Sequence, residues 1–161
     1  MSNESSTTAR VGAPAPDFTL PDQSGTPVRL GDFIGKRVVV LYFYPMDETP
    51  GCTAEACSFR DSYEDFTRAG AEVIGVSGDS VGSHQRFAAH HQLPFTLLSD
   101  AGGKVAKLYD VQKTLGLFPG RVTFVIDRQG VIRHAFSSAT QIDKHISAAA
   151  AIVRQLAAEA S

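Results

Sequence analysis

The sequence predicts an α/β protein with a central mixed sheet, helices on both faces of that sheet, and an N-terminal β-hairpin. Short apolar runs alternate along the chain with longer segments whose apolar residues recur at helical spacing. This alternation is typical of a sheet that is covered by helices on both faces. Two apolar segments near the C-terminal end, at 122–126 and 131–136, are separated by one short turn. They predict an antiparallel hairpin, and therefore a mixed sheet.

The clearest predicted strand is Val38–Phe43, a six-residue run of valine, leucine and aromatic residues. A small hairpin near the N-terminal end would pair 17–20 with 27–30 across the turn at 22–25. The remaining predicted strands are 71–76, 95–98, 122–126 and 131–136.

Helices are expected between these strands and after the last of them. Three are predicted to be amphipathic, because their apolar residues recur three or four positions apart. Asp79 and Thr140 are the expected N-caps of the second and the last helix, and a short helix is expected at 104–109. The predicted packed faces are Ala56, Phe59, Tyr63 and Phe66; Val81, His84, Phe87, Ala88 and His91; and Ile142, Ile146, Ala149, Ile152 or Val153, and Leu156.

The only two cysteines of the chain lie where the strand Val38–Phe43 should turn into a helix. Pro50 and Gly51 end the strand, and Thr49 is placed to be the N-cap of the helix. Cys52 would then lie in the first helical turn, where backbone N–H groups without helical partners and the helix dipole favour an anion. Its thiol should be ionised more often than that of a free cysteine. This position predicts a sheltered, activated nucleophile.

Cys57 follows Cys52 by five positions. On a regular helix the Cα atoms of such a pair are about 8.6 Å apart, whereas a disulfide tolerates no more than ~7 Å. The two residues can be helical or bonded, but not both at once. A bond would require the first turns of the helix to unwind, which favours a reversible catalytic disulfide over a structural one. The alternative is that Cys57 is a bystander thiol on the side of the helix.

Composition narrows the classes of protein to consider. With 161 residues, 43% of them hydrophobic, the chain can bury a substantial core, and we expect a loose tail at 1–10 and one domain at 11–161. A net charge of −2 with scattered basic residues argues against nucleic-acid binding. No apolar run approaches the ~20 residues that span a bilayer, so no membrane association is expected. Two cysteines without a signal sequence fit a reducing, cytoplasmic location.

The segment 43–61 resembles the active-site segment of the peroxiredoxins, in particular the bacterioferritin-comigratory-protein or Q-type subgroup. Pro45, Thr49 and Cys52 match the Pro-x-x-x-Thr-x-x-Cys pattern of that family, and Cys57 matches the resolving cysteine of the subgroup. The resemblance extends from Val11 to the final helix. It implies a thioredoxin-like fold.

The resemblance also implies a thiol-dependent peroxidase that reduces hydrogen peroxide and organic hydroperoxides, as part of antioxidant defence. Cys52 would be the peroxidatic nucleophile and would become a sulfenic acid. Cys57 would condense with it to give an intramolecular disulfide, which thioredoxin or a similar dithiol would reduce. No cofactor is implied. The expected assembly is a monomer or a weak homodimer, to which an apolar patch at 115–119 could contribute.

Four further residues take roles from the resemblance. Arg121 matches the active-site arginine of the family, and with Thr49 it would donate hydrogen bonds to the peroxide oxygens. Glu55 would orient Arg121, and Pro45 would shield the thiol from water. Without the resemblance, Thr49 could be an N-cap only, and Arg121 and Glu55 could be solvated charges. The apolar segment 112–120 departs from the more polar segment that relatives often carry, which leaves its role in the pocket open.

Two other functional classes compete with a peroxidase. A thiol–disulfide oxidoreductase should carry Cys-x-x-Cys and usually a proline before the threonine of a later strand, whereas Arg121 and Val122 precede Thr123 here. A copper chaperone of the same fold would need Cys-x-x-x-Cys and a histidine. Both cysteine spacings differ from the one in this chain, so the peroxidase interpretation is favoured.

The five histidines predict no metal site. Neither His84 nor His90 has a histidine partner four positions on, although His84 and His91 could share one face of a helix. His134 and His145 are interpreted as ordinary surface or strand positions.

Overall fold

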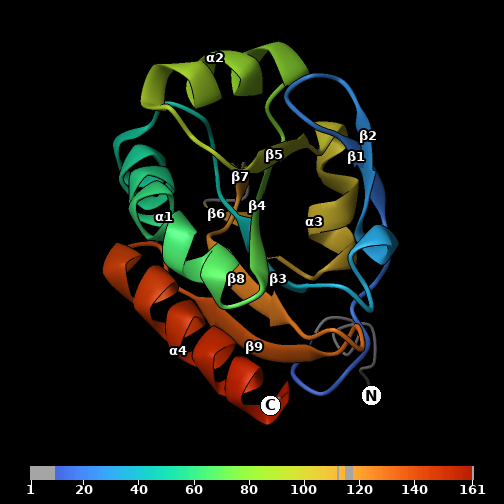
Figure 1. Cartoon of the computed structure of the whole chain (residues 1–161). Coiled ribbons are helices and arrows are strands. Elements are labelled where there is room, and N and C mark those ends of the chain that lie inside the picture. The colour runs from blue at the N-terminus through green and yellow to red at the C-terminus, as the bar shows by residue number, and fades with distance from the viewer. Residues whose placement is uncertain (1–9, 112, 115–117, 161) are drawn as a thin grey trace.

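The structure is a computed structural model that describes residues 10–111, 113–114 and 118–160. Within these residues the centre is a five-stranded sheet in the order β5-β4-β3-β8-β9 (Figure 1). The strands are β1 (Thr19–Pro21), β2 (Pro27–Arg29), β3 (Val38–Phe43), β4 (Ala71–Ser77), β5 (Thr96–Ser99), β6 (Lys113–Thr114), β7 (Phe118–Pro119), β8 (Val122–Ile126) and β9 (Ile132–Ser137), and the α-helices are α1 (Pro50–Arg68), α2 (Val81–His91), α3 (Lys104–Leu108) and α4 (Ile142–Ala160). The predicted tail falls almost entirely outside the described residues.

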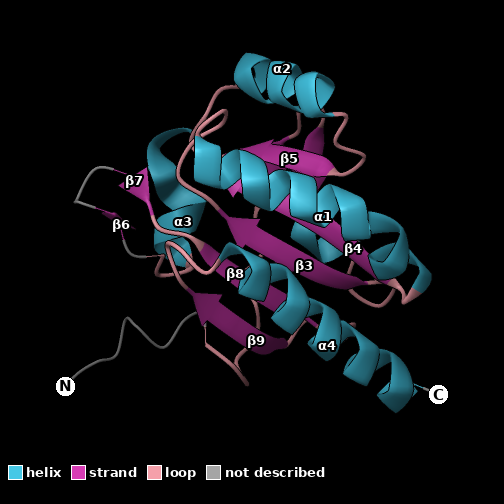
Figure 2. Cartoon of the chain, turned by 90° about the vertical axis from the view of Figure 1, so that its left-hand side faces the viewer, coloured by secondary structure: helices cyan, strands magenta, loops and turns pink. Residues whose placement is uncertain are grey.

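The sheet is mixed, as predicted. Strands β3, β4 and β5 run parallel to one another, whereas β8 lies antiparallel to β3, and β9 lies antiparallel to β8. Helices α1 and α4 lie on one side of the sheet, and α3 and the β1–β2 hairpin lie on the other (Figures 1 and 2). Both faces are therefore covered, which explains why the β3 sequence is apolar at every position rather than at alternate ones.

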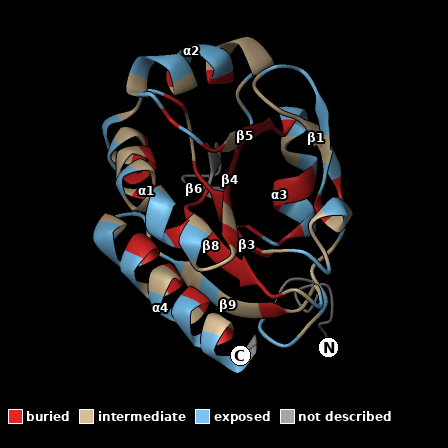
Figure 3. Cartoon of the chain, in the orientation of Figure 1, coloured by how far each residue is buried: buried red, intermediate tan, exposed pale blue. Residues whose placement is uncertain are grey.

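Two apolar cores follow from the alternation of side chains along β3. Tyr42 points to the side of the helices α1, α2 and α4, where it stacks on Phe59 with ring centroids 4.5 Å apart. Leu41 and Phe43 point to the opposite side, where Phe43 packs near Tyr109, a residue that follows α3. Strands β3 and β8 are buried at every position, and β4 at every position except Glu72 (Figure 3). Because β3 is held between two cores, the position of its C-terminal end, where the chain continues toward α1, is fixed.

The register between β3 and β8 brings distant parts of the chain together. Phe43, the last residue of β3, pairs with Val122, the first residue of β8. Because the two strands are antiparallel, the chain enters β8 beside the point where it leaves β3. Arg121 is thereby delivered next to the start of α1, which follows β3.

Several boundaries differ from the predicted ones for local reasons. The side chain of Ser80, not of Asp79, caps α2 by accepting a hydrogen bond from the Ser83 N–H. The side chain of Asp79 instead bonds with Ser77. Before α4, the hydroxyl that accepts backbone N–H groups belongs to Ser138 rather than to the predicted Thr140. In each case two hydroxyl or carboxyl side chains compete within a few residues, and sequence alone does not rank them.

The segment 112–120 contains the short paired strands β6 and β7, which were not predicted. The expected apolar patch at 115–119 lies largely outside the described residues. The oligomeric state therefore stays a prediction.

Gly75 in β4 allows Tyr42 to lie across the sheet. A Cβ at Gly75 would lie 2.9 Å from Cζ of Tyr42, closer than real Cβ atoms come, and a tight 3.0 Å from Cδ2 of Leu97. We predict that Gly75→Ala lowers the free energy of unfolding by about 1–3 kcal/mol, because the Tyr42 ring must shift within a packed core. Urea denaturation measures the change. Gly78→Ala is the control, since its Cβ would meet its nearest atom at an ordinary 3.7 Å. Equal stability of the two variants would contradict the prediction.

Candidate active site

Cys52 lies in the first turn of α1, directly after the loop that leaves β3. The helix begins at Pro50, as predicted, and Thr49 occupies the N-cap position. The Cys52 side chain is packed into the core on the helical side of the sheet, and the residue is only 1% exposed. The backbone N–H groups of this first turn lack helical acceptors, and they create a positive local potential. The predicted sheltered position of Cys52 is thus what the structure has.

Arg121 lies against the thiol, as the strand register requires. Its Nη1 is 3.6 Å from Sγ of Cys52 and donates a hydrogen bond of 2.7 Å to Oε1 of Glu55. Its Nε donates to the carbonyl of Ala139 at 3.2 Å. Arg121 is 8% exposed, so it is a buried cation rather than the solvated residue that local sequence alone would suggest. Three separate acceptors fix the guanidinium in one orientation.

Glu55 is fully buried one helical turn after Cys52. Burial raises the pKa of Glu55 to about 7, although the charge of Arg121 and its hydrogen bond favour the carboxylate. Oε2 of Glu55 has no hydrogen-bond partner among the residues that the structure describes. The carboxyl can therefore change its protonation state within the neutral pH range.

His145 completes the polar cluster from the side of α4. The interpretation of His145 as an ordinary surface or strand position is wrong, because its side chain is fully buried, with Nδ1 3.7 Å from Oε2 of Glu55. Burial is the main cause that lowers the pKa of His145, so the ring is neutral. Its Nε2 is 2.8 Å from the carbonyl of Ser138, to which it must donate. Nδ1, 2.7 Å from the Thr123 hydroxyl, then accepts from that hydroxyl.

A signal in the sequence could have located His145. It lies three positions after Ile142 and four before Ala149, on the apolar stripe that packs α4 against the sheet. A histidine within such a stripe is expected to be buried. Thr123 has a similar signal, because it interrupts the apolar strand β8.

The loop between β3 and α1 is held by a buried polar network around Asp47. The Asp47 carboxylate accepts hydrogen bonds from the Tyr44 hydroxyl at 2.6 Å, from the Ser83 hydroxyl at 2.8 Å and from Nδ1 of His84 at 2.7 Å. Nε2 of His84 is 2.9 Å from the Leu98 carbonyl, so both ring nitrogens face acceptors. The ring and the carboxylate thus form a buried hydrogen-bonded pair. It joins the loop to α2 and β5.

The remaining predicted site residues lie nearby. The Thr49 hydroxyl donates to the carbonyl of Met46 at 2.9 Å, within the same loop, rather than to a helix N–H. Pro45 is half-buried at the start of this loop. Cys57 is on α1 and partly exposed, and both thiols are free. Since α1 is continuous from residue 50 to residue 68, the two cysteines are both helical here.

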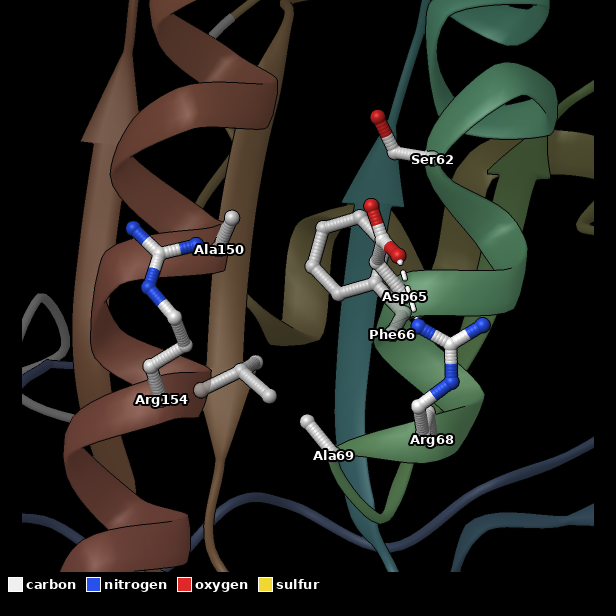
Figure 4. A pocket seen from close by; sticks show the side chains of 8 residues that line it. Ser62, Asp65, Phe66, Arg68, Ala69, Ala150 and Arg154 are labelled. Atoms are coloured by element: carbon white, nitrogen blue, oxygen red, sulfur yellow. Dashed lines mark hydrogen bonds and ion pairs between the residues drawn. The ribbon is translucent and has the colours of Figure 1, made fainter.

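A separate groove of about 550 Å³ lies between the C-terminal half of α1 and α4 (Figure 4). Phe66 lies at its base, and Arg154 of α4 faces Asp65 and Arg68 of α1 across it. None of its lining residues belongs to the polar cluster of Arg121, Glu55, His145 and Thr123 beside Cys52. The groove is therefore not part of the candidate active site.

A buried thiol at a helix N-terminus, beside a buried guanidinium and on this α/β fold, defines a cysteine-based redox enzyme. A model of the AhpC/TSA family matches residues 11–135. The chain belongs to this family, and within it to the peroxiredoxins of the Q type, as the sequence resemblance indicated. It is a thiol-dependent peroxidase with an antioxidant role, whose substrate is a peroxide and whose reductant is of the thioredoxin type.

The similar proteins and solved structures are peroxiredoxins or peroxidoxins. Peroxiredoxin Q of Sedum lineare is 54% identical over 146 residues, which cover 90% of this chain and 78% of that protein. Peroxiredoxin Q of Triticum aestivum is 53% identical and covers 90% of this chain and 67% of that protein. Among solved structures, peroxidoxin BcpB from Mycobacterium tuberculosis has a TM-score of 0.85 and 40% identity, covering 92% of this chain and 98% of that one. Peroxiredoxin Q of Xanthomonas campestris has a TM-score of 0.80 and 32% identity, covering 87% and 91%.

The comparisons do not support the expected cytoplasmic location, because the plant relatives are named as chloroplastic proteins. Within the described residues, none of the helices has the length and apolar character needed to cross a membrane.

We predict that Glu55→Gln changes how stability depends on pH. The Glu55 carboxyl has a pKa near 4.5 when unfolded and about 7 when folded, so the folded state binds this proton more tightly. The contribution of this group to the free energy of unfolding is fully present below about pH 4.5. It is lost as the pH rises to about 7, a decrease on the order of 3 kcal/mol. The Gln variant lacks this loss.

Urea unfolding at about pH 5 and about pH 7.5 measures the difference between the two proteins. His145 titrates in the opposite sense in both of them, since burial lowers its pKa, so only the difference isolates Glu55. Glu64→Gln is the control, because the Glu64 side chain is 85% exposed and should leave the pH dependence unchanged. The same pH dependence in Glu55→Gln and in the unaltered protein would contradict the assignment.

Proposed function

We propose that Cys52 is the residue that attacks the peroxide. The observation that carries this proposal is the contact of 3.6 Å between Nη1 of Arg121 and Sγ of Cys52 in the first turn of α1. The guanidinium and the unpaired backbone N–H groups surround Sγ with positive charge. The thiolate is the form of a cysteine that acts as a nucleophile.

In the proposed reaction the Cys52 thiolate attacks one oxygen of the peroxide. A sulfur–oxygen bond forms, the oxygen–oxygen bond breaks, and the second oxygen leaves with the electron pair and takes up a proton to become water or an alcohol. The sulfur is oxidised by two electrons and becomes a sulfenic acid. Negative charge develops on both oxygens, so hydrogen-bond donors aimed at them lower the barrier.

The donors proposed for this step are the Arg121 guanidinium, the backbone N–H of Cys52 and the Thr49 hydroxyl, whose single proton must turn from the Met46 carbonyl to the peroxide. Glu55 is the proposed positioning residue for Arg121, because the hydrogen bond of 2.7 Å between them fixes the plane of the guanidinium. Pro45, half-buried in the preceding loop, would limit access of water to the thiol.

In the second step of the proposed reaction, Cys57 is the resolving residue. Its thiol would attack the Cys52 sulfenic acid, with release of water and formation of a disulfide. Because both residues are helical and about 8.6 Å apart by helix geometry, α1 must unwind locally before the bond can form. A thioredoxin dithiol would then reduce the disulfide by exchange.

The first experiment is peroxide turnover with thioredoxin, thioredoxin reductase and NADPH. Cys52→Ser should abolish consumption of hydrogen peroxide and of an alkyl hydroperoxide, since no nucleophile remains. Cys57→Ser should give one fast turnover and then stop with Cys52 trapped as a sulfenic acid. Mass spectrometry identifies that product, and a Cys52–Cys57 disulfide in the unaltered protein. Steady cycling of Cys57→Ser would assign resolution to another thiol, and rapid reduction of a test disulfide without peroxide turnover would favour an oxidoreductase.

The substitution Gly51→Ala tests the role of Arg121 without removing a charged group. A Cβ at Gly51 would lie 3.0 Å from Nη2 of Arg121, so Gly51→Ala would displace the guanidinium by a few tenths of an ångström. Gly51 is helical, and Ala is the better helix former by about 1 kcal/mol. We therefore predict a rate of Cys52 oxidation lower by about tenfold, with stability unchanged or increased.

Single-turnover oxidation by hydrogen peroxide measures this rate, and urea unfolding measures the stability. Gly82→Ala is a matched control, because Gly82 is the second residue of α2, as Gly51 is of α1, and its nearest contact would be an ordinary 3.5 Å. An unchanged oxidation rate in Gly51→Ala would separate Arg121 from the reaction.

A further inference from the structure

A second cluster of potential ligands lies beside the active-site loop, where Glu48 meets the C-terminal end of α2. Nδ1 of His90 is 3.3 and 3.2 Å from the two carboxylate oxygens of Glu48. Nε2 of His91 is 3.2 Å from one of the same oxygens. The three groups thus direct two imidazole nitrogens and a carboxylate toward one point.

The spacing of these atoms fits the coordination shell of a small divalent ion. Zinc binds imidazole nitrogen and carboxylate oxygen at about 2.0–2.2 Å with tetrahedral angles, so its ligand atoms lie about 3.3–3.4 Å apart. The imidazole–carboxylate distances of 3.2–3.3 Å are close to this value. All three donor atoms lie within 4.8 Å of one another. Little rearrangement is needed to admit an ion.

The ligands are supported by their surroundings. His91 is 19% exposed, and the edge of its ring packs on Phe87 at a centroid distance of 5.2 Å. The two histidine rings lie 4.3 Å apart. The carbonyl of His91 accepts a hydrogen bond of 2.8 Å from Arg60 of α1, which fixes the end of α2. Glu48 has a φ of 65°, in the left-handed region that few residues other than glycine adopt.

The other cluster of this kind, Asp47, Asp79 and His84, is a poorer candidate. Its members already bond with Tyr44, Ser77, Ser83 and the Leu98 carbonyl. Both nitrogens of His84 are occupied, so an ion would have to break buried hydrogen bonds. At Glu48 the side chains are partly open to solvent, and an ion would replace only the bonds among the three ligands.

We propose that Glu48, His90 and His91 form a binding site for a zinc-like divalent metal ion, with a fourth position open to solvent. Two imidazoles and one carboxylate are a common ligand set for zinc in sites that keep such a position. The ion would link the loop that carries Thr49 to the end of α2. Histidine spacing alone predicted no metal site. The proposal differs from that prediction because the third ligand, Glu48, comes from a different segment of the chain.

Zinc binding by the full-length chain tests the proposal. The chain has only five histidines and two cysteines, so Cys52→Ser combined with Cys57→Ser removes the competing thiolates without touching the proposed ligands. Isothermal titration calorimetry of this protein with zinc chloride should show one equivalent bound. His90→Ala and Glu48→Gln should each weaken the affinity at least tenfold, and Glu64→Gln, an exposed carboxylate on α1, should not.

A thermal unfolding series provides the second measurement. Zinc should raise the unfolding temperature of the cysteine-free protein by more than it raises that of the Glu48→Gln variant. Circular dichroism confirms that each variant is folded before titration. No zinc binding, or binding that His90→Ala and Glu48→Gln leave unaltered, would overturn the proposal. The result does not depend on peroxidase chemistry, since the protein tested has neither thiol.

Discussion

The antiparallel pairing of β3 with β8 is the constraint on which the active site depends. Because Phe43 pairs with Val122, Arg121 enters the core at the point where the chain turns from β3 into α1. The cysteine and the arginine are 69 positions apart in the sequence, and the register alone brings them within 3.6 Å. A change of register by one residue would turn Arg121 to the other face of the sheet. The chemistry therefore rests on the same hydrogen bonds that hold the sheet together.

The polar cluster carries an energetic cost within an apolar core. Burying the Arg121 and Glu55 charges costs several kcal/mol per ion before their attraction is counted. One Glu55 oxygen lacks a hydrogen-bond partner among the described residues, so the cost is only partly offset. His145 and Thr123 bond with each other as neutral groups and add polarity without another charge. Such a cluster is poorly explained by stability, and its better explanation is the orientation of the guanidinium.

How much the sequence could predict depends on how local each feature is. The strand Val38–Phe43 and the start of α1 at Pro50 are each determined by neighbouring residues in the sequence, and both predictions are confirmed. The place of Arg121 depends on the pairing of distant strands, so only resemblance to a family indicated it. The contacts of His145 and Glu48 join separate elements, so histidine spacing within one helix could not predict them, although the apolar stripe of α4 could have indicated that His145 is buried. The predicted N-cap of α2, Asp79, is wrong because Asp79 and Ser80 compete for the same position.

The network around Asp47 determines which part of the active-site region can move. It ties the loop before α1 to α2 and β5 through the Tyr44 hydroxyl, the Ser83 hydroxyl and the His84 ring. Among the residues that the structure describes, no such hydrogen bonds hold the thiol of Cys57, which is free and partly exposed on α1. When the helix unwinds in the proposed cycle, the loop therefore serves as the fixed end. In that cycle Cys57 would move toward Cys52 as the first turns of α1 unwind, while the loop before the helix would stay attached to α2 and β5.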